Sequence, residues 1–129
     1  MPALPPAHVQ VATPVSVNPG NWSGTDWIEM DAYDTIQVTL KLTSGATAPT
    51  ALAVRVEATN TASGTPTAAE TFEVTPRFPI TPAAANQSVD YSVTLCRGAY
   101  GDHARYRIQA SPTSQSVNVS YIVSRSKLT

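Results

Sequence analysis

Alternation between apolar and polar residues is the feature that most limits how this chain can fold. The clearest example is Tyr33–Thr43, in which Ile36, Val38, Leu40 and Leu42 alternate with threonine, glutamine and lysine. Successive side chains of a β-strand point to opposite faces, so the run predicts a strand with one buried side and one wettable side. No apolar repeat of 3.6 residues extends far enough to predict a helix.

Five later segments repeat this alternation, and glycine, proline or small polar residues separate them. They are Thr50–Asn60, Thr71–Thr75, Ser88–Arg97, His103–Ala110 and Gln115–Ser124. Weaker segments lie near Val9–Val17 and Trp27–Met30. This arrangement predicts an all-β fold, an antiparallel β-sandwich, and about eight strands in two sheets would make it a jelly roll. Residues 76–87, with three prolines, predict an irregular crossover, and residues 111–114 predict a turn.

Residues 1–20 form a proline-rich segment, which we expect to be an extended arm preceding a sandwich domain at residues 21–129. Its five prolines fix φ and remove backbone donors, so neither a helix nor a central strand can run through it. Valines placed two residues apart stand between the prolines, which a disordered linker rarely shows. They would let the arm add an edge strand to its own sheet or to a neighbour's. They are Val9, Val11, Val15 and Val17.

Charged residues make up only 13% of the chain, and serine and threonine take their place. Hydroxyl groups cost less to bury than charges, so such a surface suits a protein whose neighbours cover it. The net charge of −1 lacks the basic footprint of a nucleic-acid-binding protein. No stretch approaches the ~20 apolar residues of a membrane helix. No signal peptide is visible, so we expect synthesis in a cytoplasm.

The charges are divided unevenly along the chain. Residues 1–73 hold two basic and seven acidic side chains, a net charge of −5, whereas residues 77–129 hold six basic and two acidic ones, a net charge of +4. In one interpretation the two halves interleave in the sandwich and neutralise each other. In the other, an acidic patch meets a basic patch on another subunit and steers assembly.

Residues that could carry catalysis are scarce, and we expect no enzyme, no cofactor and no metal. His8 lies in the proline-rich arm, and His103 beside Asp102 lies in a turn, which by itself is not triad geometry. Neither a nucleophile elbow, a zinc signature nor a phosphate-binding loop occurs. The acids at residues 26–34 lack the spacing of a calcium loop, so a solvated acidic loop is the simpler interpretation. Cys96, the only cysteine, lies in a strand pattern that favours a buried thiol.

Both tryptophans, Trp22 and Trp27, lie just after the arm. The simpler interpretation is that they cap or fill the core. The alternative is that one of them, or Tyr100, is exposed as a stacking platform for a sugar or as an interface anchor. In the last predicted strand, Ile122 interrupts the polar face, which favours a subunit contact. The candidate interface residues are Val9, Val11, Val15, Val17, Trp22, Trp27 and Ile122.

The order of strand motifs resembles a family of small virion proteins. The motifs are WIEMDAYDTIQVTL, then AVRVEATNTASG, then RYRIQA and finally VNVSYIV. Over residues 22–124 they resemble the jelly-roll domains of tailed bacteriophages, found in head decoration (cement) proteins and in fibre or tail modules. These domains are distantly similar to galactose-binding, discoidin-like sandwiches. The resemblance is one of strand pattern and includes no reactive residues.

The resemblance implies a structural role in the virion. The protein would bind the outer surface of a phage capsid and stabilise it through repeated contacts and its N-terminal arm. Its partners would be the major capsid protein and copies of itself, in a trimer or another symmetric homo-oligomer. The alternatives are a carbohydrate-binding or lectin-like module, for which a sugar would be the partner, and a tail or fibre component.

Overall fold

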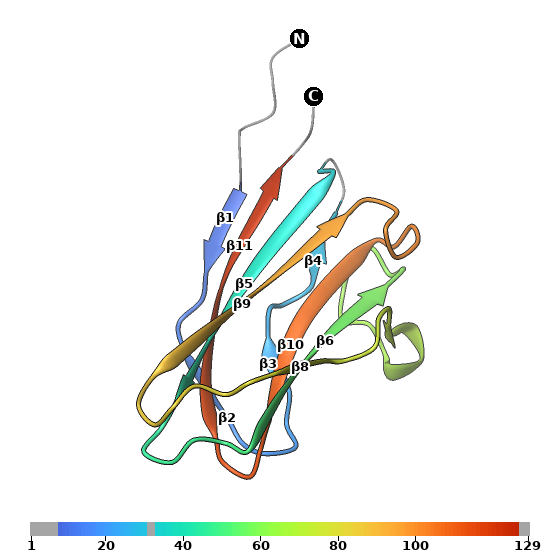
Figure 1. Ribbon diagram of the computed structural model, residues 1–129. Coiled ribbons are helices and arrows are strands. Elements are labelled where there is room, and N and C mark those ends of the chain that lie inside the picture. The colour runs from blue at the N-terminus through green and yellow to red at the C-terminus, as the bar shows by residue number, and fades with distance from the viewer. Residues whose placement is uncertain (1–7, 31–32, 127–129) are drawn as a thin grey trace.

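The computed structural model describes residues 8–30 and 33–126, with side chains from residue 11 onward. Two antiparallel sheets pack face to face and confirm the predicted β-sandwich (Figure 1). One short 3₁₀ helix, η1 (Ala68–Glu70), lies in the loop before β7. The strands are β1 (His8–Val11), β2 (Val15–Val17), β3 (Ser23–Gly24), β4 (Ile28–Glu29), β5 (Thr35–Ser44), β6 (Ala51–Thr59), β7 (Phe72–Glu73), β8 (Phe78–Ile80), β9 (Ser88–Cys96), β10 (Arg105–Thr113) and β11 (Val117–Ser126).

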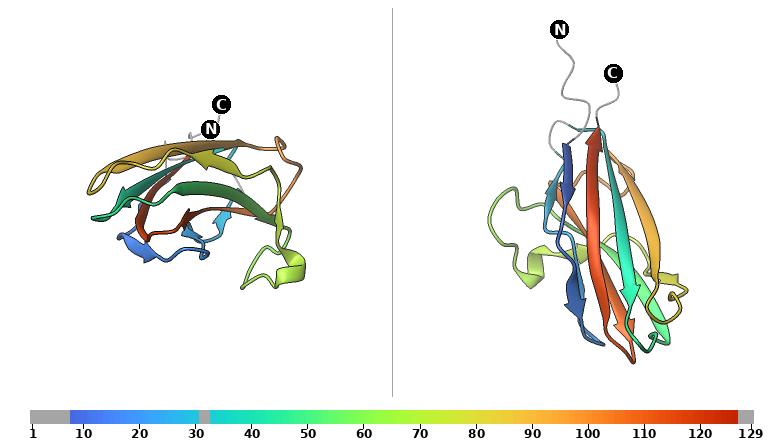
Figure 2. Two further views of the ribbon diagram at one scale, coloured as in Figure 1. Left: turned by 60° about the horizontal axis from the view of Figure 1, so that its bottom comes forward. Right: turned by 90° about the vertical axis from the view of Figure 1, so that its left-hand side faces the viewer.

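We call the two layers sheet A and sheet B. Sheet A has the order β1–β11–β5–β9, with β2 also on β11; sheet B has the order β3–β10–β6–β7, with β4 also on β10 and β8 also on β6. The right-hand view of Figure 2 shows sheet A from its edge strands β1 and β2 (blue), across β11 (red) and β5 (cyan), to β9 (orange). Three sheet edges consist of two short consecutive strands each: β1 with β2, β3 with β4, and β7 with β8. If each of these pairs is counted as one strand, the sandwich has eight strands in chain order, arranged 1-8-3-6 in sheet A and 2-7-4-5 in sheet B. This is the order of a jelly roll, in which a long hairpin wraps into two sheets.

The core lies between the sheets and consists of one side-chain row from each long strand. In β5 the side chains of Ile36, Val38, Leu40 and Leu42 are all buried, as the alternation predicts. Even-numbered residues of β6 and β10 face them from sheet B, and odd-numbered residues of β9 and β11 flank them in sheet A. Burial of these rows is the main stabilising contribution, at about 25 cal/mol per Å² of apolar surface removed from water.

Residues 8–17 of the predicted arm belong to the sandwich. β1 and β2 both pair antiparallel with β11, and the N–H of Ala12 between them donates to the Tyr121 carbonyl at 3.1 Å. The sequence left open whether this segment adds to its own sheet or to a neighbour's. The structure shows that residues 8–17 add to their own sheet. Val17 is buried at 3% exposure and packs in the core, which removes it from the candidate interface residues.

Two segments contain strands that the sequence did not predict. β8 lies within the expected irregular crossover, where Pro79 sits opposite Ala53 at the edge of sheet B, and β3 pairs with β10. Proline is tolerated at such an edge because its missing N–H would face away from the sheet.

β10 continues through the expected turn at residues 111–114. Both backbone groups of Ile108 bond to Thr25 on the β3 side, and four residues later the carbonyl of Pro112 accepts from the N–H of Gly20 on the same side. The N–H that proline lacks would therefore not have bonded to β6. The turn itself begins at Ser114, which has a positive φ of 76°.

Gly24 is where β3 approaches β10 most closely. A Cβ at this position would overlap the carbonyl oxygen of Ile108 and lie 2.8 Å from the Cα of Gln109, both of them backbone atoms. We expect Gly24→Ala to destabilise the protein by about 2 kcal/mol or more, because the strand must move away from β10. Gly45→Ala, whose Cβ would have no neighbour within 4 Å, is the matched control. Equal midpoints in urea unfolding of the two variants would contradict this close packing.

Candidate functional site

The outer face of sheet A is built from the alternate residues that do not enter the core. Five positions on each of β5, β9 and β11 point to this side, because directly paired residues of antiparallel strands share a face. We call this surface the hydroxyl face. Its residues are Thr35, Gln37, Thr39, Lys41 and Thr43 on β5, Ser88, Asp90, Ser92, Thr94 and Cys96 on β9, and Asn118, Ser120, Ile122, Ser124 and Ser126 on β11.

The hydroxyl face carries very little charge. Lys41 and Asp90 are its only charged residues, and they are direct cross-strand neighbours. Hydroxyl groups bond across the strands, between Thr39 and Ser92 at 3.0 Å and between Thr43 and Ser88 at 2.7 Å. In each of these bonds, both the donor and the acceptor belong to the hydroxyl face, so part of its hydrogen-bonding capacity is satisfied without water. Covering this face with another protein therefore costs less desolvation energy than covering a charged one.

An apolar spot lies at the β1 side of the hydroxyl face. Val11 is paired with Ile122, and the two side chains are 69% and 47% exposed. Both were candidate interface residues, and the fold brings them together. Val15 is also exposed, but its register opposite Val119 places it at the rim of the core side. Val9 lies opposite Ser124 in the register, and its side chain is outside the described part of the chain.

The outer face of sheet B has a different chemistry, dominated by arginine and tryptophan. The guanidinium carbons of Arg55 and Arg77 lie 4.4 and 4.8 Å from the centre of the Trp22 ring. Those of Arg107 and Arg105 lie 4.5 and 5.9 Å from the Trp27 ring. Cation–π contacts of this kind contribute about 0.5–2 kcal/mol each, depending on their solvent exposure. We call this set the Trp–Arg layer.

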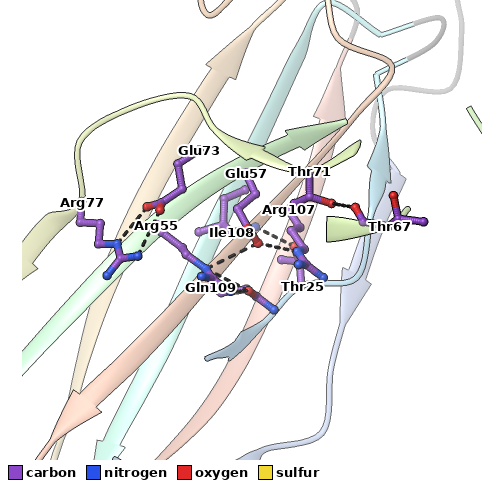
Figure 3. A network of polar contacts seen from close by, with 10 residues as sticks. All are labelled: Thr25, Arg55, Glu57, Thr67, Thr71, Glu73, Arg77, Arg107, Ile108 and Gln109. Atoms are coloured by element: carbon purple, nitrogen blue, oxygen red, sulfur yellow. Dashed lines mark hydrogen bonds and ion pairs between the residues drawn. The ribbon is translucent and has the colours of Figure 1, made fainter. Parts of the chain in front are cut away.

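Acidic and amide groups bond to three arginines of the Trp–Arg layer, Arg55, Arg77 and Arg107 (Figure 3). Glu57, which is 6% exposed, accepts a hydrogen bond from Arg107 at 2.6 Å and lies 3.5 Å from Arg55. Arg55 also donates to the Gln109 side chain at 2.8 and 3.2 Å. Burial lowers the pKa of the Arg55 guanidinium, and the charge of Glu57 acts in the opposite direction. At the edge of the layer, Arg77 donates to Glu73 and lowers the pKa of that carboxyl group.

Both tryptophans are therefore half-buried on the outer side of sheet B and do not fill the core between the sheets. A sugar-stacking platform needs an open ring face, and each of these rings already carries two guanidinium groups. The sequence could not foresee this, because the arginines come from β6, β10 and the segment after β7. In the linear chain they lie far from residues 22–27.

The ion pairs also decide how the two oppositely charged halves of the chain meet. Arg107 pairs with Glu57, Arg97 with Asp34 at 3.6 Å, and Arg77 with Glu73. Each pair joins the basic second half to the acidic first half within one molecule. These contacts favour internal neutralisation over an acidic patch that seeks a basic patch on another subunit.

A shallow hollow of about 620 Å³ lies at one end of the sandwich, and His103 forms part of its wall. The Nε2 of His103 is 2.7 Å from the carbonyl oxygen of Tyr100, within hydrogen-bond distance. Its Nδ1 lies 3.1 Å from Asn60 Oδ1, and the ring packs edge-on against Phe72 and Tyr106. These contacts give His103 a role in holding the end of the sandwich together.

The remaining expectations concern metals, thiols and membranes. Within residues 8–30 and 33–126, no group of three or more histidine, cysteine, aspartate or glutamate side chains is placed to hold a metal ion. Cys96 is a free and exposed thiol, so its expected burial is wrong: it belongs to the outward row of β9. In the same part of the chain, no helix has the length and apolar character needed to span a bilayer.

The chain matches no family model, and no curated protein matches it.

Glu57 offers a test of the Trp–Arg layer. We expect Glu57→Gln to lower the free energy of unfolding by about 2 kcal/mol, because it leaves two part-buried guanidinium groups without their counter-ion. Glu73→Gln removes the same charge from the exposed pair with Arg77, and we expect a loss of less than about 1 kcal/mol. Chemical unfolding of both variants measures the difference. Equal losses would mean that the buried carboxylate does not organise the layer.

Proposed function

We propose that this chain is a structural protein of a phage virion that binds the outer surface of the capsid and stabilises it. The observation that carries the proposal is the hydroxyl face, an exposed sheet surface with Lys41 and Asp90 as its only charges. A free-standing domain of ordinary composition has about twice this chain's 13% share of charged residues. The jelly-roll strand order agrees with the strand pattern that resembles phage decoration proteins.

The proposed mechanism works through area and repetition. Stable protein interfaces bury roughly 1,000 Å² or more, with an apolar centre and a polar rim. The hydroxyl face offers Val11 and Ile122 as the apolar anchor and rows of serine and threonine as the surround. On a symmetric shell the same modest contact recurs at every equivalent position. The virion and the major capsid protein are thus the proposed location and partner.

The pairing of β1 and β2 with β11 changes the role proposed for the N-terminal segment. Residues 8–17 complete the chain's own sheet, and Val17 fills the core. Deleting residues 1–20 would expose the edge of β11 and open the core, so it would not test capsid binding cleanly. A substitution on the face itself is the sharper test.

The Trp–Arg layer weighs against the carbohydrate-binding alternative. Two of the three candidate rings, Trp22 and Trp27, are partnered by arginine side chains, and the third, Tyr100, packs against the core. A tail or fibre component could use the same hydroxyl face. The location of the protein on the particle, head or tail, distinguishes that alternative from capsid binding.

A redecoration assay tests the proposal. Particles of the encoding phage that lack this protein are incubated with the purified recombinant chain, and bound protein is measured after sedimentation. Thr39→Lys places an ammonium group in the middle of the hydroxyl face, and we expect it to weaken binding roughly tenfold or more, because that charge must be desolvated.

The control for redecoration is Ser63→Lys, which adds the same charge to an exposed loop beside sheet B. We expect its binding to stay within about twofold of the original chain. Equal binding by the Thr39→Lys variant, or no binding by the unmodified chain, would refute the proposal. A sugar-specific signal on a glycan array that Trp22→Ala abolishes would favour the lectin alternative.

A further inference from the structure

The four sheet edges of the sandwich are protected to very different degrees. Three of them consist of two short strands each, namely β1 with β2, β3 with β4, and β7 with β8, and none of these strands exceeds four residues. Short and interrupted edges are a common way to prevent pairing with other chains. The fourth edge is β9, an unbroken strand of nine residues without proline.

The direction of the β9 backbone groups follows from the bonds at its two ends. The N–H of Ser44 donates to Gln87 at 2.8 Å, and the N–H of Arg97 donates to Asp34 at 2.7 Å. Backbone groups alternate sides along an antiparallel strand. The odd-numbered residues of β9 therefore bond to β5. The even-numbered ones point away from the sheet; they are Ser88, Asp90, Ser92, Thr94 and Cys96.

These outward groups are nearly all unused within the described part of the chain. β9 pairs with β5 alone, and the only other backbone bond at the outward residues is the one that the Cys96 carbonyl accepts from Ala99. The edge therefore presents a row of free N–H and C=O groups at regular spacing. Such a row is a template for another strand.

Apolar side chains beside this edge are only partly covered. Val89 and Tyr91 of β9, with Phe78 and Ile80 of β8, pack against the core but keep part of their surface exposed. The rings of Phe78 and Tyr91 lie 6.1 Å apart and bridge the two sheets at this side of the sandwich. A partner strand on β9 would bury more of this surface.

We propose that β9 pairs antiparallel with β9 of a second copy of this chain, so that two A sheets become one continuous sheet. The two-fold axis passes through Ser92, the midpoint of β9. Only this register lets all five outward residues of one copy bond to those of the other. It places Asp90 opposite the partner's Thr94 and Ser88 opposite the partner's Cys96.

The charges on β9 agree with this register. An axis at Asp90 would bring two carboxylates face to face, which is unfavourable, and an axis at Thr94 would shorten the overlap. In the proposed register each Asp90 keeps Lys41 as its neighbour on β5 and meets a threonine across the junction. The pairing uses the strand edge and leaves the hydroxyl face open, so it does not depend on the proposed capsid binding.

A disulfide trap tests both the pairing and its register. In an H-bonded antiparallel pair the Cα atoms are about 5.5 Å apart, within the range for a disulfide. Under mild oxidation we expect Ser88→Cys to link to the native Cys96 of the partner and form a covalent dimer. The two positions are about 26 Å apart within one strand, so no disulfide can form inside one chain.

Thr43→Cys is the matched control for the disulfide trap. Thr43 lies beside Ser88 on β5 and shares its side-chain hydrogen bond, so both variants lose the same bond, but Thr43 is one strand further from the edge. On a non-reducing gel, with the linked peptides identified by mass spectrometry, we expect Ser88→Cys to give a dimer joined through an 88–96 link and Thr43→Cys to give no comparable 43–96 link. Equal cross-linking of both variants, or no 88–96 link, would overturn the proposal.

A second measurement uses the chain without an added cysteine. Light scattering after size exclusion should show a dimer for the original sequence and a monomer for Thr94→Pro. The N–H that this proline removes points outward, so the ladder to β5 and the circular dichroism spectrum should be preserved. A monomeric original chain, or a folded dimeric Thr94→Pro variant, would also overturn the pairing. Thr39→Lys should remain dimeric, which separates this result from the outcome of the capsid assay.

Discussion

The fold depends on burying one side-chain row of every long strand between the two sheets. The rows of β5 and β6 face each other across the core, and those of β9, β10 and β11 extend it. Because a strand has only two faces, fixing the inner row also fixes which residues form the outer row. A register shift of one residue would exchange the rows and expose the core. The outer faces are therefore set by the same pattern that folds the chain.

The two outer faces that result have opposite characters. Sheet B covers its outer side with its own side chains, because tryptophans and arginines stack there and a buried carboxylate links them. Sheet A leaves its outer side open, with short hydroxyl side chains and one apolar spot. Its β9 edge is open as well. The free surfaces of the molecule thus belong to sheet A, and both proposals are built on that sheet.

The sequence was sufficient to predict the sandwich, its antiparallel sheets and about eight strands, because alternation is a local property that survives folding; the jelly-roll strand order came from the structure. It could not predict β3, which has only two small residues, Ser23 and Gly24, and Pro79 argued against a strand at β8. Cys96 was expected to be buried, but its position in the outward row of β9 exposes it. Counting the alternation from Val93 and Leu95 onward would have shown this.

Among the candidate interface residues, the sequence found Val11 and Ile122, which meet on the hydroxyl face. It could not separate them from Val17, because the face of a short edge strand is set by its register with β11. The surroundings of Trp22 and Trp27 were also hidden, since the arginines that cover them come from distant strands. Long-range contacts decide such surroundings, and a single sequence does not encode them in its local pattern.

Electron cryomicroscopy of phage particles incubated with this protein is the most direct test of the proposed capsid binding. The expected density is a two-layered sandwich on the outer surface of the head, with the hydroxyl face of sheet A against the capsid shell and the Trp–Arg layer towards solvent. Density confined to the tail, or a sandwich that contacts the shell through the Trp–Arg layer, would contradict the account.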